Sequence, residues 1–440
     1  MRGQNTHFLA GVVVCVIAFT YSIGAEEKVK LAVPADALLA KSESQLKAIY
    51  KTEYARPPLA RRPFAKQLLD GAQNANSDPA TRFVLFREAA NVAASSGDIT
   101  TAIGAIDELS KVFAVDAARY QSNAIVQSAR MIDSMPQAMV FLTTANALLE
   151  RFSAEGDPAA AMRIANTMGF VAAQMRNRPL VEGVRARVAL MKEIQVEYDR
   201  LKPAMDHPPA SDRNGDLAGG KFECFFNDDW QGGLRRLMNC PDPKLKDVAA
   251  RDISNPKDAA GQFALGNSWW ELAQKQSGYS RTRFQMRAAH WYRQAVGSLG
   301  ELEKGLAEKR MAASAGAPAE ATTFGGHAYL YDATVMTWHE AKLACELAGG
   351  HLMCVESEKE HLFIVDLLAK RRSWLGASDE KEEGQWLWVN GSPFKFSAWR
   401  GGEPNNADGN ENCLLLNEGG KWFDVPNRTS KGTGFVCEWE

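Results

Sequence analysis

Tryptophan is distributed so unevenly along this 440-residue chain that it marks regions of different architecture. None of the 11 tryptophans precedes Trp230, four lie between 230 and 291, and seven lie between 338 and 439. The region before residue 200 is instead rich in alanine and carries apolar residues at helical spacing. The last region contains short aromatic and β-branched runs such as WLWVNG, which indicate strands. The sequence therefore predicts helical domains followed by a domain that contains strands.

The first 25 residues have the pattern of a secretory signal peptide. Arg2 precedes the apolar run FLAGVVVCVIAFTYSIGA, which ends in small residues and is followed by the charged EEKVK. An uncleaved anchor is the alternative, and no later segment is long and apolar enough to span a bilayer. The mature chain is therefore expected to be secreted, or periplasmic or on the cell surface. Removal of residues 1–25 leaves six cysteines, an even number that permits disulfides.

Residues 26–202 are predicted to be an α-helical repeat-like region. Two segments share Gly-Asp followed by alanine at the same offset, namely Gly97, Asp98 and Ala102, and Gly156, Asp157 and Ala161. This pattern predicts a helix, a short turn and a second helix, with the small alanine allowing close packing of the pair. Such hairpins stack because neither face is buried by one hairpin alone.

The remaining helical segment is predicted between two linkers. Residues 203–220 form a Pro/Gly/Asp-rich linker, and residues 312–323 form a flexible linker of small residues. Between them, residues 221–311 contain FALGNSWWELAQKQ and RFQMRAAHWYRQAV, which resemble one tetratricopeptide-like or Sel1-like hairpin. That resemblance implies a protein partner, although such patterns also occur in ordinary helical bundles. The large aromatic side chains are expected in the core: Trp269, Trp270, Trp291 and Tyr292.

Charge and motifs argue against two classes of function. The net charge of −2 lacks the basic excess that a nucleic-acid-binding face needs. His339 and Glu340 begin an H-E-x-x-H pattern, but position 343 is leucine, so the zinc motif is absent. There is no C-x-x-C or G-x-S-x-G, and each histidine is interpreted as an isolated surface or core residue. The chain is therefore expected not to be an enzyme.

The stretch GGEPNNADGNENCLLLNEGGKWFDV, residues 401–425, is unusually rich in carboxylates and amides. Such side chains at uneven spacing do not build a core, but they supply oxygen atoms. Calcium requires six to eight oxygen ligands, roughly, from carboxylates, amides and backbone carbonyls. The sequence alone leaves two interpretations open, which are a calcium-binding loop and a solvated, turn-rich loop.

Five separated pieces follow one another near the C-terminus: WHEAKLACELAGGHLMCVES, WLGASDEKEEGQWLWVNG, SAWRGGEPNNADGNENCLLL, GGKWFDV and GFVCEWE. In this order they resemble a C-type lectin-like domain, with a pattern similar to that of mannose-binding collectins. The resemblance covers residues 324–440. Together with the helical segments upstream, it implies a multidomain fold, in which an all-α helical-hairpin repeat region is followed by an α+β C-type lectin-like domain.

The resemblance implies a sugar-associated calcium site with side-chain ligands Glu403, Asn405, Glu411 and Asp424. Pro404 would be the cis proline between the first two, and Glu403, Asn405 and Glu411 would also bind sugar. Glu403 with Asn405 favours hydroxyls of the mannose or glucose kind. One departure is Phe423, which stands where the family has asparagine. Phenylalanine supplies no oxygen, so a weak calcium site is expected.

A second metal site and a disulfide are implied in the same way. The second site would use Asp379, Glu383, Asn406 and Asn412, with Glu411 shared, and amides replace carboxylates at two of these positions. Cys345 and Cys437 would form a disulfide, against the alternative of two buried thiols. Cys413 lacks its usual family partner, and a bond to Cys354 or two free thiols remain open.

The leading hypothesis is an exported, non-enzymatic carbohydrate-binding protein with a calcium-dependent lectin-like module. The alternative is a lectin-fold scaffold that binds a protein partner without calcium or sugar. Phe423 favours the scaffold, whereas the intact Glu403-Pro404-Asn405 favours the lectin.

Overall fold

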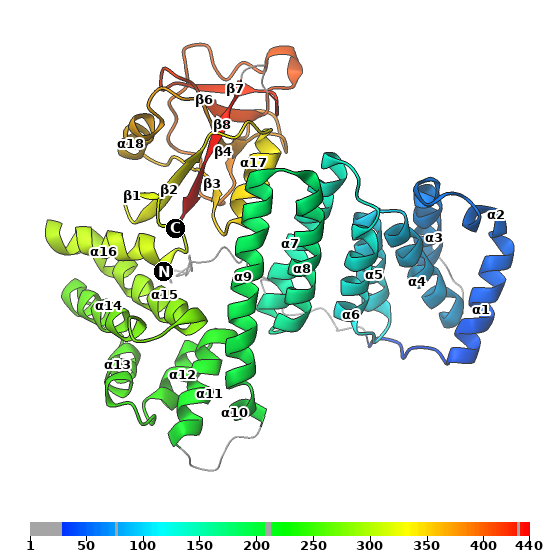
Figure 1. Cartoon of the computed structure of the whole chain (residues 1–440), viewed down its shortest axis with the longest axis horizontal. Coiled ribbons are helices and arrows are strands. Elements are labelled where there is room, and N and C mark those ends of the chain that lie inside the picture. Colours follow the sequence, from blue (N-terminus) through cyan, green and yellow to red (C-terminus); the bar gives the residue numbers. More distant parts are fainter. Residues whose placement is uncertain (1–28, 75–77, 207–212, 429–431) are drawn as a thin grey trace, which may run out of the picture. The chain divides into compact units, whose positions relative to one another are not determined.

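The computed structural model describes residues 29–74, 78–206, 213–428 and 432–440. The signal peptide expected at 1–25 and the centre of the 203–220 linker lie outside these ranges. The described chain is helical up to Ser314 and continues as an α+β domain, as predicted (Figure 1). Among the described helices, none combines the length and apolar character that crossing a membrane requires. The chain divides into two compact units, with the boundary between Val184 and Arg185.

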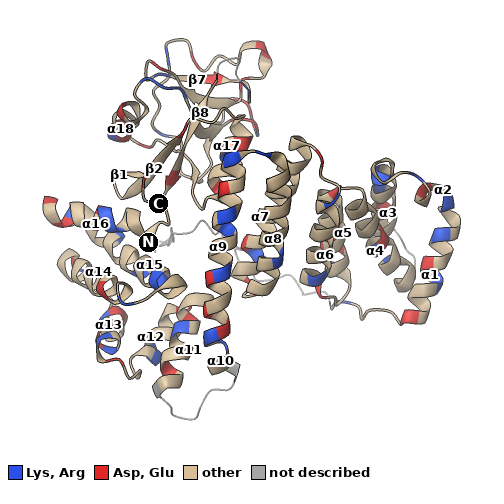
Figure 2. Ribbon diagram, in the orientation of Figure 1, with Lys and Arg blue, Asp and Glu red and all other residues tan. Residues whose placement is uncertain are grey.

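The first unit consists of helices, most of which pack against helices close to them in the sequence. Their bounds are α1 Asp36–Ile49, α2 Lys51–Tyr54, η1 Pro58–Arg61, α3 Arg62–Asn74, α4 Pro79–Ser95, α5 Ile99–Val112, α6 Ala117–Ala129, α7 Met135–Ala154 and α8 Pro158–Met175, with α9 Arg178–Leu201 crossing the boundary. Lysine and arginine alternate with aspartate and glutamate along these helices (Figure 2). This mixture is typical of solvated helix surfaces.

The two predicted Gly-Asp turns are confirmed between α4 and α5 and between α7 and α8. Gly97 and Gly156 have φ of 70° and 75°, which glycine adopts without the steric penalty of a side chain. Asp98 and Asp157 then cap the next helices, accepting from the backbone N–H of Thr101 and Ala160 at 3.1 and 2.8 Å. Each turn thus ends one helix and begins the next within three residues.

The second unit begins with a helical part. Its further helices are α10 Pro203–Asp206, α11 Arg213–Phe226, α12 Trp230–Leu237, α13 Pro243–Ser254, α14 Ala259–Ala273, α15 Gly278–Ala295, η2 Val296–Ser298 and α16 Glu301–Ser314. Trp269, Trp291 and Tyr292 are buried, as predicted, and Trp270 is partly buried. The indole N–H groups of Trp269 and Trp291 both donate to the buried carboxylate of Asp252, at 2.7 and 2.9 Å. This carboxylate connects α13, α14 and α15.

Both predicted linkers contain more helix than their compositions indicate. Gly219 and Gly220 lie inside α11, where a Cβ on Gly220 would come within 2.8 Å of the Gly233 carbonyl oxygen in α12. The missing side chains therefore allow two helices to approach closely. In the second linker, α16 continues to Ser314, and Ala312 and Ala315 are buried.

The C-terminal part of the second unit is built on one mixed sheet. Its elements are β1 Thr322–Phe324, β2 His327–Asp332, α17 Trp338–Leu347, β3 His351–Leu352, α18 Glu358–Leu368, β4 Ser373–Ser378, β5 Leu387–Trp388, η3 Ala407–Gly409, β6 Cys413–Leu416, β7 Trp422–Val425 and β8 Gly434–Trp439. The strand order is β1-β2-β8-β4-β6-β7, with β3 paired to β8 and β5 paired to β4. Strands β4 and β8 are parallel, and the other pairs are antiparallel. Figure 1 shows α17 and α18 beside this sheet.

The predicted disulfide between Cys345 in α17 and Cys437 in β8 is confirmed. Cys354 and Cys413 form no disulfide within the described residues, and both are buried, as are Cys224 and Cys240. The open question about Cys354 and Cys413 is therefore answered by two free thiols in this structure.

An aromatic cluster fills the space beneath β5 and β7. Trp422 is fully buried, and its ring centroid lies 5.9 Å from that of Trp388 and 6.1 Å from that of Trp399. Trp386 lies 5.1 Å from Trp399, and Phe394 contacts Trp388 and Trp422. Trp422 therefore supports the strand that carries Asp424 from the core side.

Candidate functional site: an oxygen-rich loop over the last strands

The segment between β5 and β7 gathers the four side chains expected to bind calcium. Glu403 precedes a cis peptide bond to Pro404. Asp424 lies in β7, where the strand alternation places it on the buried side with Trp422 and leaves it 3% exposed. The Oδ2 atom of Asp424 accepts from the backbone N–H groups of Asn405 and Asn406, at 2.8 and 2.6 Å. One buried carboxylate thus fixes the loop that follows the cis peptide bond.

The other expected ligands are held by bonds within the loop. The Asn405 amide donates to Glu403 Oε2. Glu411 Oε2 accepts from the Ala407 N–H at 2.8 Å, and the Glu411 N–H donates to Asn406 Oδ1 at 3.1 Å. Glu403 and Glu411 are partly exposed, and Asn405 is exposed. The loop therefore presents carboxylate and amide groups to solvent around a single buried acid.

Residues expected at the second site lie next to the first. The Asn406 amide donates to Glu383 Oε2 at 2.5 Å. Asp379 is 2% exposed; its Oδ2 accepts from the Gly384 N–H at 2.9 Å, and its own N–H donates to the Asn412 carbonyl at 3.3 Å. Asn406 thus links the two groups of residues.

Three buried oxygen atoms at this site are available to coordinate a cation. Asp379 Oδ1, Asn412 Oδ1 and Asp424 Oδ1 have no hydrogen-bond partner among the described residues. Buried polar atoms are normally paired, and leaving one unpaired costs about 1–3 kcal/mol. Oxygens of this kind are ligands that calcium prefers. The residues present therefore fit a hard cation.

The carboxylates also repel one another. Burial, the hydrogen bond shared with Asp424 and the charges of Asp424 and Glu411 raise the pKa of Glu403. Burial and the charges of Asp424 and Asp408 raise the pKa of Glu411, despite the opposing Ala407 N–H. Burial also raises the pKa of Asp379, with the charges of Asp424 and Glu380 adding to it. A bound cation would relieve this repulsion.

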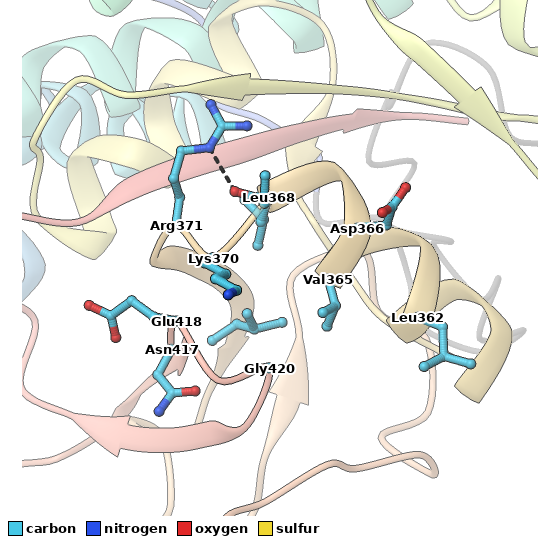
Figure 3. Close-up of a pocket in the computed structure, with 11 residues that line it drawn as sticks. Leu362, Val365, Asp366, Leu368, Lys370, Arg371, Asn417, Glu418 and Gly420 are labelled. Atoms are coloured by element: carbon cyan, nitrogen blue, oxygen red, sulfur yellow. Dashed lines mark hydrogen bonds between the residues drawn. The ribbon is translucent and has the colours of Figure 1, made fainter.

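A separate pocket of about 350 Å³ lies at the end of α18, beside the turn between β6 and β7 (Figure 3). Its lining includes Val365, Lys370, Arg371 and Glu418, and Arg371 Nε donates to the Leu368 carbonyl at 2.7 Å. None of the expected calcium or sugar ligands lines it. The pocket is thus distinct from the oxygen-rich loop.

Comparison with known proteins assigns the fold of this region. Residues 334–439 match the family model described as the Lectin C-type domain. This region is a C-type lectin domain. The rest of the chain lies outside that match.

Individual relatives match the lectin domain alone. Hepatic lectin of Gallus gallus is 38% identical over 104 residues, which are 23% of this chain and 50% of that protein. C-type lectin domain family 17, member A of Homo sapiens is 36% identical over 116 residues, or 26% of this chain and 30% of that protein. The chain thus spans half or less of the length of these relatives. Both are named as lectins, not enzymes, and this likeness concerns the C-terminal domain only.

One solved structure is the cow C-type carbohydrate-recognition domain of CD23, determined in the presence of a GlcNAc2Man3 oligosaccharide. It is 33% identical, the alignment covers 28% of this chain and 94% of that chain, and the TM-score is 0.27.

Sequence reasoning missed one group of residues in the lectin domain. His351, Cys354 and Glu438 lie together, and His327 lies with Glu438 and Glu440, so neither histidine is isolated as the sequence predicts. The spacing of His351 and Cys354, three residues apart, was a signal within the sequence. Glu438 joins them only through strand pairing, because β3 places His351 opposite Glu438 in β8.

Proposed function

We propose that this chain is an exported, non-enzymatic carbohydrate-binding protein whose lectin domain uses calcium. Glu403, Asn405, Glu411 and Asp424 would bind the ion. The observation that carries the proposal is the buried Asp424 carboxylate. Its Oδ2 orders the loop after the cis peptide bond, while its Oδ1 has no hydrogen-bond partner among the described residues.

Each residue has a separate task in this proposal. Calcium would supply coordination positions for two neighbouring sugar hydroxyls. Glu403 would accept a hydrogen bond from one hydroxyl, and the Asn405 amide, which now donates to Glu403, would donate to the other. Their alternation of acceptor and donor suits vicinal hydroxyls of the mannose or glucose kind. Asp424 would hold the loop and would not contact the sugar.

The neighbouring residues support a second ion. Asp379 and Asn412 each have a buried oxygen without a hydrogen-bond partner in the described part of the chain. Glu383 and Asn406 lie beside them and are joined by a hydrogen bond. We infer an auxiliary calcium site here. It would be the weaker of the two, because amides at two positions lower its negative charge.

A glycan array probed with the full chain, once in millimolar calcium and once with chelator, tests the proposal. Binding to mannose- or glucose-type glycans that chelator abolishes would support it. Absence of glycan binding in both conditions would contradict it, as would binding that chelator leaves unchanged.

The scaffold alternative rests on Phe423. This side chain is partly buried in β7, and the Arg400 guanidinium lies 5.4 Å from its ring centroid. An aromatic ring stacked with an arginine would suit contact with a protein surface. Phe423 also stands where the resemblance leads us to expect an oxygen ligand for calcium. A calcium titration by calorimetry separates the two functions. Heat at millimolar calcium together with a raised melting temperature would support the lectin function. The absence of both signals would support the scaffold function.

Replacing Phe423 with asparagine should tighten calcium binding by about tenfold, because the amide adds one oxygen to an incomplete shell. Phe423→Leu is the matched control, since it removes the ring without adding an oxygen. Calorimetric titration of both variants and the parent chain measures the difference. Equal calcium affinities in Phe423→Asn and Phe423→Leu would show that this position does not limit the site.

Calcium affinity should also fall between about pH 7 and about pH 5, because ions and protons compete for carboxylate ligands. Burial and neighbouring charges raise the pKa values of Glu403 and Glu411, so both bind protons at higher pH than free glutamate does. Without calcium the pH dependence of stability has the opposite direction. The folded state favours the protonated forms of Glu403 and Glu411, so these two groups destabilise it less as the pH falls. Calorimetry across this range checks the first effect, and a constant affinity would contradict it.

A further inference from the structure

A second cluster of ligand-type side chains lies in the lectin domain, where β2, β3 and β8 run side by side. Strand β8 pairs with β2 on one side and with β3 on the other, and Glu438 of β8 is opposite both Tyr329 and His351. Cys354 is the second residue after β3, and its backbone N–H donates to Glu438 Oε2 at 2.8 Å. His351, Cys354 and Glu438 are 5%, 1% and 1% exposed. Three chemically different ligand types are thus buried together.

The distances among the ligand atoms suit one small metal ion. His351 Nδ1 lies 3.7 Å from Cys354 Sγ and 3.9 Å from Glu438 Oε2. All three ligand atoms lie within 4.8 Å of one another. Zinc binds nitrogen and oxygen at about 2.0–2.2 Å and thiolate at about 2.3 Å in tetrahedral geometry, which places ligand atoms roughly 3.3–3.7 Å apart. The two distances from His351 Nδ1 would therefore shorten by a few tenths of an ångström on binding, and the third pair of ligand atoms, Cys354 Sγ and the Glu438 carboxylate, already lies within 4.8 Å.

Neighbouring groups hold the ligands in the orientation that a metal requires. His351 Nε2 lies 2.8 Å from Glu440 Oε1, and Glu440 also accepts from the Asn390 amide at 3.0 Å. When His351 donates its Nε2 proton to Glu440, its Nδ1 lone pair faces Cys354 and Glu438. On the far side, His327 Nδ1 lies 2.6 Å from Glu438 Oε1. A carboxylate behind a ligating histidine is the usual supporting arrangement in metal sites.

We propose that His351 Nδ1, Cys354 Sγ and Glu438 Oε2 bind one Zn²⁺ ion in the base of the lectin domain. A thiolate with an imidazole selects zinc over calcium, which prefers oxygen ligands. The Leu352 carbonyl oxygen, 3.1 Å from Nδ1 and 3.5 Å from Sγ, faces the same space. Binding releases the thiol proton, and any proton on Nδ1, to solvent. The thiolate and the Glu438 carboxylate then balance the two charges of the ion.

Protons occupy the same groups when zinc is absent. Burial lowers the pKa of His351, but its hydrogen bonds to Cys354 and Glu440 and the charge of Glu438 outweigh burial and leave this pKa well above its ordinary value. Burial raises the pKa of the Cys354 thiol to about 11. A histidine with two glutamates therefore forms a stable metal-free state, and the experiment must separate that state from the zinc-bound one.

Cobalt substitution separates them, because tetrahedral Co²⁺ bound to thiolate has a charge-transfer absorption that oxygen ligands do not give. The full chain is stripped with chelator and titrated with Co²⁺ in excess calcium, which competes with Co²⁺ for sites made of oxygen ligands. We expect the thiolate band to saturate near one equivalent and to vanish on addition of Zn²⁺. Absence of the band in the parent chain would overturn the proposal.

Two variants locate the site. Cys354→Ser should lose the thiolate band, whereas Cys413→Ser should keep it, since Cys413 is equally buried in the same domain but belongs to neither ligand cluster found among the described residues. Glu440→Gln, which removes the carboxylate that supports His351, should keep the band and weaken zinc affinity about 10–100-fold. A band that persists in Cys354→Ser would overturn the proposal.

A measurement on the parent chain covers the case in which Cys354→Ser fails to fold. Zinc should slow alkylation of Cys354 at least tenfold and leave the alkylation rate of Cys413 unchanged, as measured by peptide mass mapping. Equal rates with and without zinc at Cys354 would overturn the proposal. Neither readout involves sugar, so the result is independent of the calcium-dependent function.

Discussion

Replacing Asp424 with asparagine should lower the calcium affinity of the chain about 100-fold, which corresponds to about 2.7 kcal/mol of binding free energy. Asparagine keeps one oxygen that accepts from the N–H groups of Asn405 and Asn406, so the loop should retain its shape. It replaces the unpaired Oδ1 with an NH2 group, which cannot coordinate a cation, and it removes one negative charge. Calorimetric titration with calcium measures the loss.

Asp366→Asn is the matched control for this experiment. Asp366 is exposed on α18, near the separate pocket and outside the oxygen-rich loop, so its substitution should leave calcium affinity unchanged. Circular dichroism in chelator should be the same for both variants and the parent. If Asp424→Asn binds calcium as tightly as Asp366→Asn, the ion is held elsewhere and the proposed ligand set is wrong.

Removing the disulfide with Cys345→Ala and Cys437→Ala together should lower the free energy of unfolding of the lectin domain by about 4 kcal/mol. The bond joins α17 to β8 across a sequence separation of 92 residues. Without it, the unfolded chain gains the entropy of a long open loop, which the loop-closure model values at roughly 4–5 kcal/mol. Urea unfolding followed by tryptophan fluorescence measures the difference.

Cys413→Ala controls for the loss of a buried sulfur atom in the same domain, which we expect to cost about 1 kcal/mol. Treating the parent chain with reductant should reproduce the instability of the double variant. A double variant within about 1 kcal/mol of Cys413→Ala would mean that the disulfide contributes little beyond its packing.

The features that the sequence could predict are those with local causes. Gly97-Asp98 and Gly156-Asp157 end one helix and cap the next through residues within one turn, so their outcome depends little on the rest of the fold. The C-type lectin domain was recognisable because its pieces follow one another in order over a continuous segment. The Cys345–Cys437 pair followed from that resemblance and not from the residues themselves.

The features that could not be predicted depend on partners far away in sequence. Gly219 and Gly220 look like helix breakers until α12 packs against them. His327, His351 and Glu438 are separated by long stretches of chain, and only the pairing of β2 and β3 with β8 brings them together. The structure brings the residues of the oxygen-rich loop together. That these residues bind calcium stays a prediction, which the titrations described above test.

The aromatic cluster beneath the oxygen-rich loop has an optical consequence. Indole rings whose centroids are 5–6 Å apart do not absorb independently, because their transition dipoles couple and give paired bands of opposite sign in circular dichroism. Trp422 belongs to this coupled set and lies two residues before Asp424 on the same strand. A small rotation of its ring would change the sign pattern and the intensity of those bands. The lectin domain therefore contains its own spectroscopic probe, which can follow events at the loop in real time without a label.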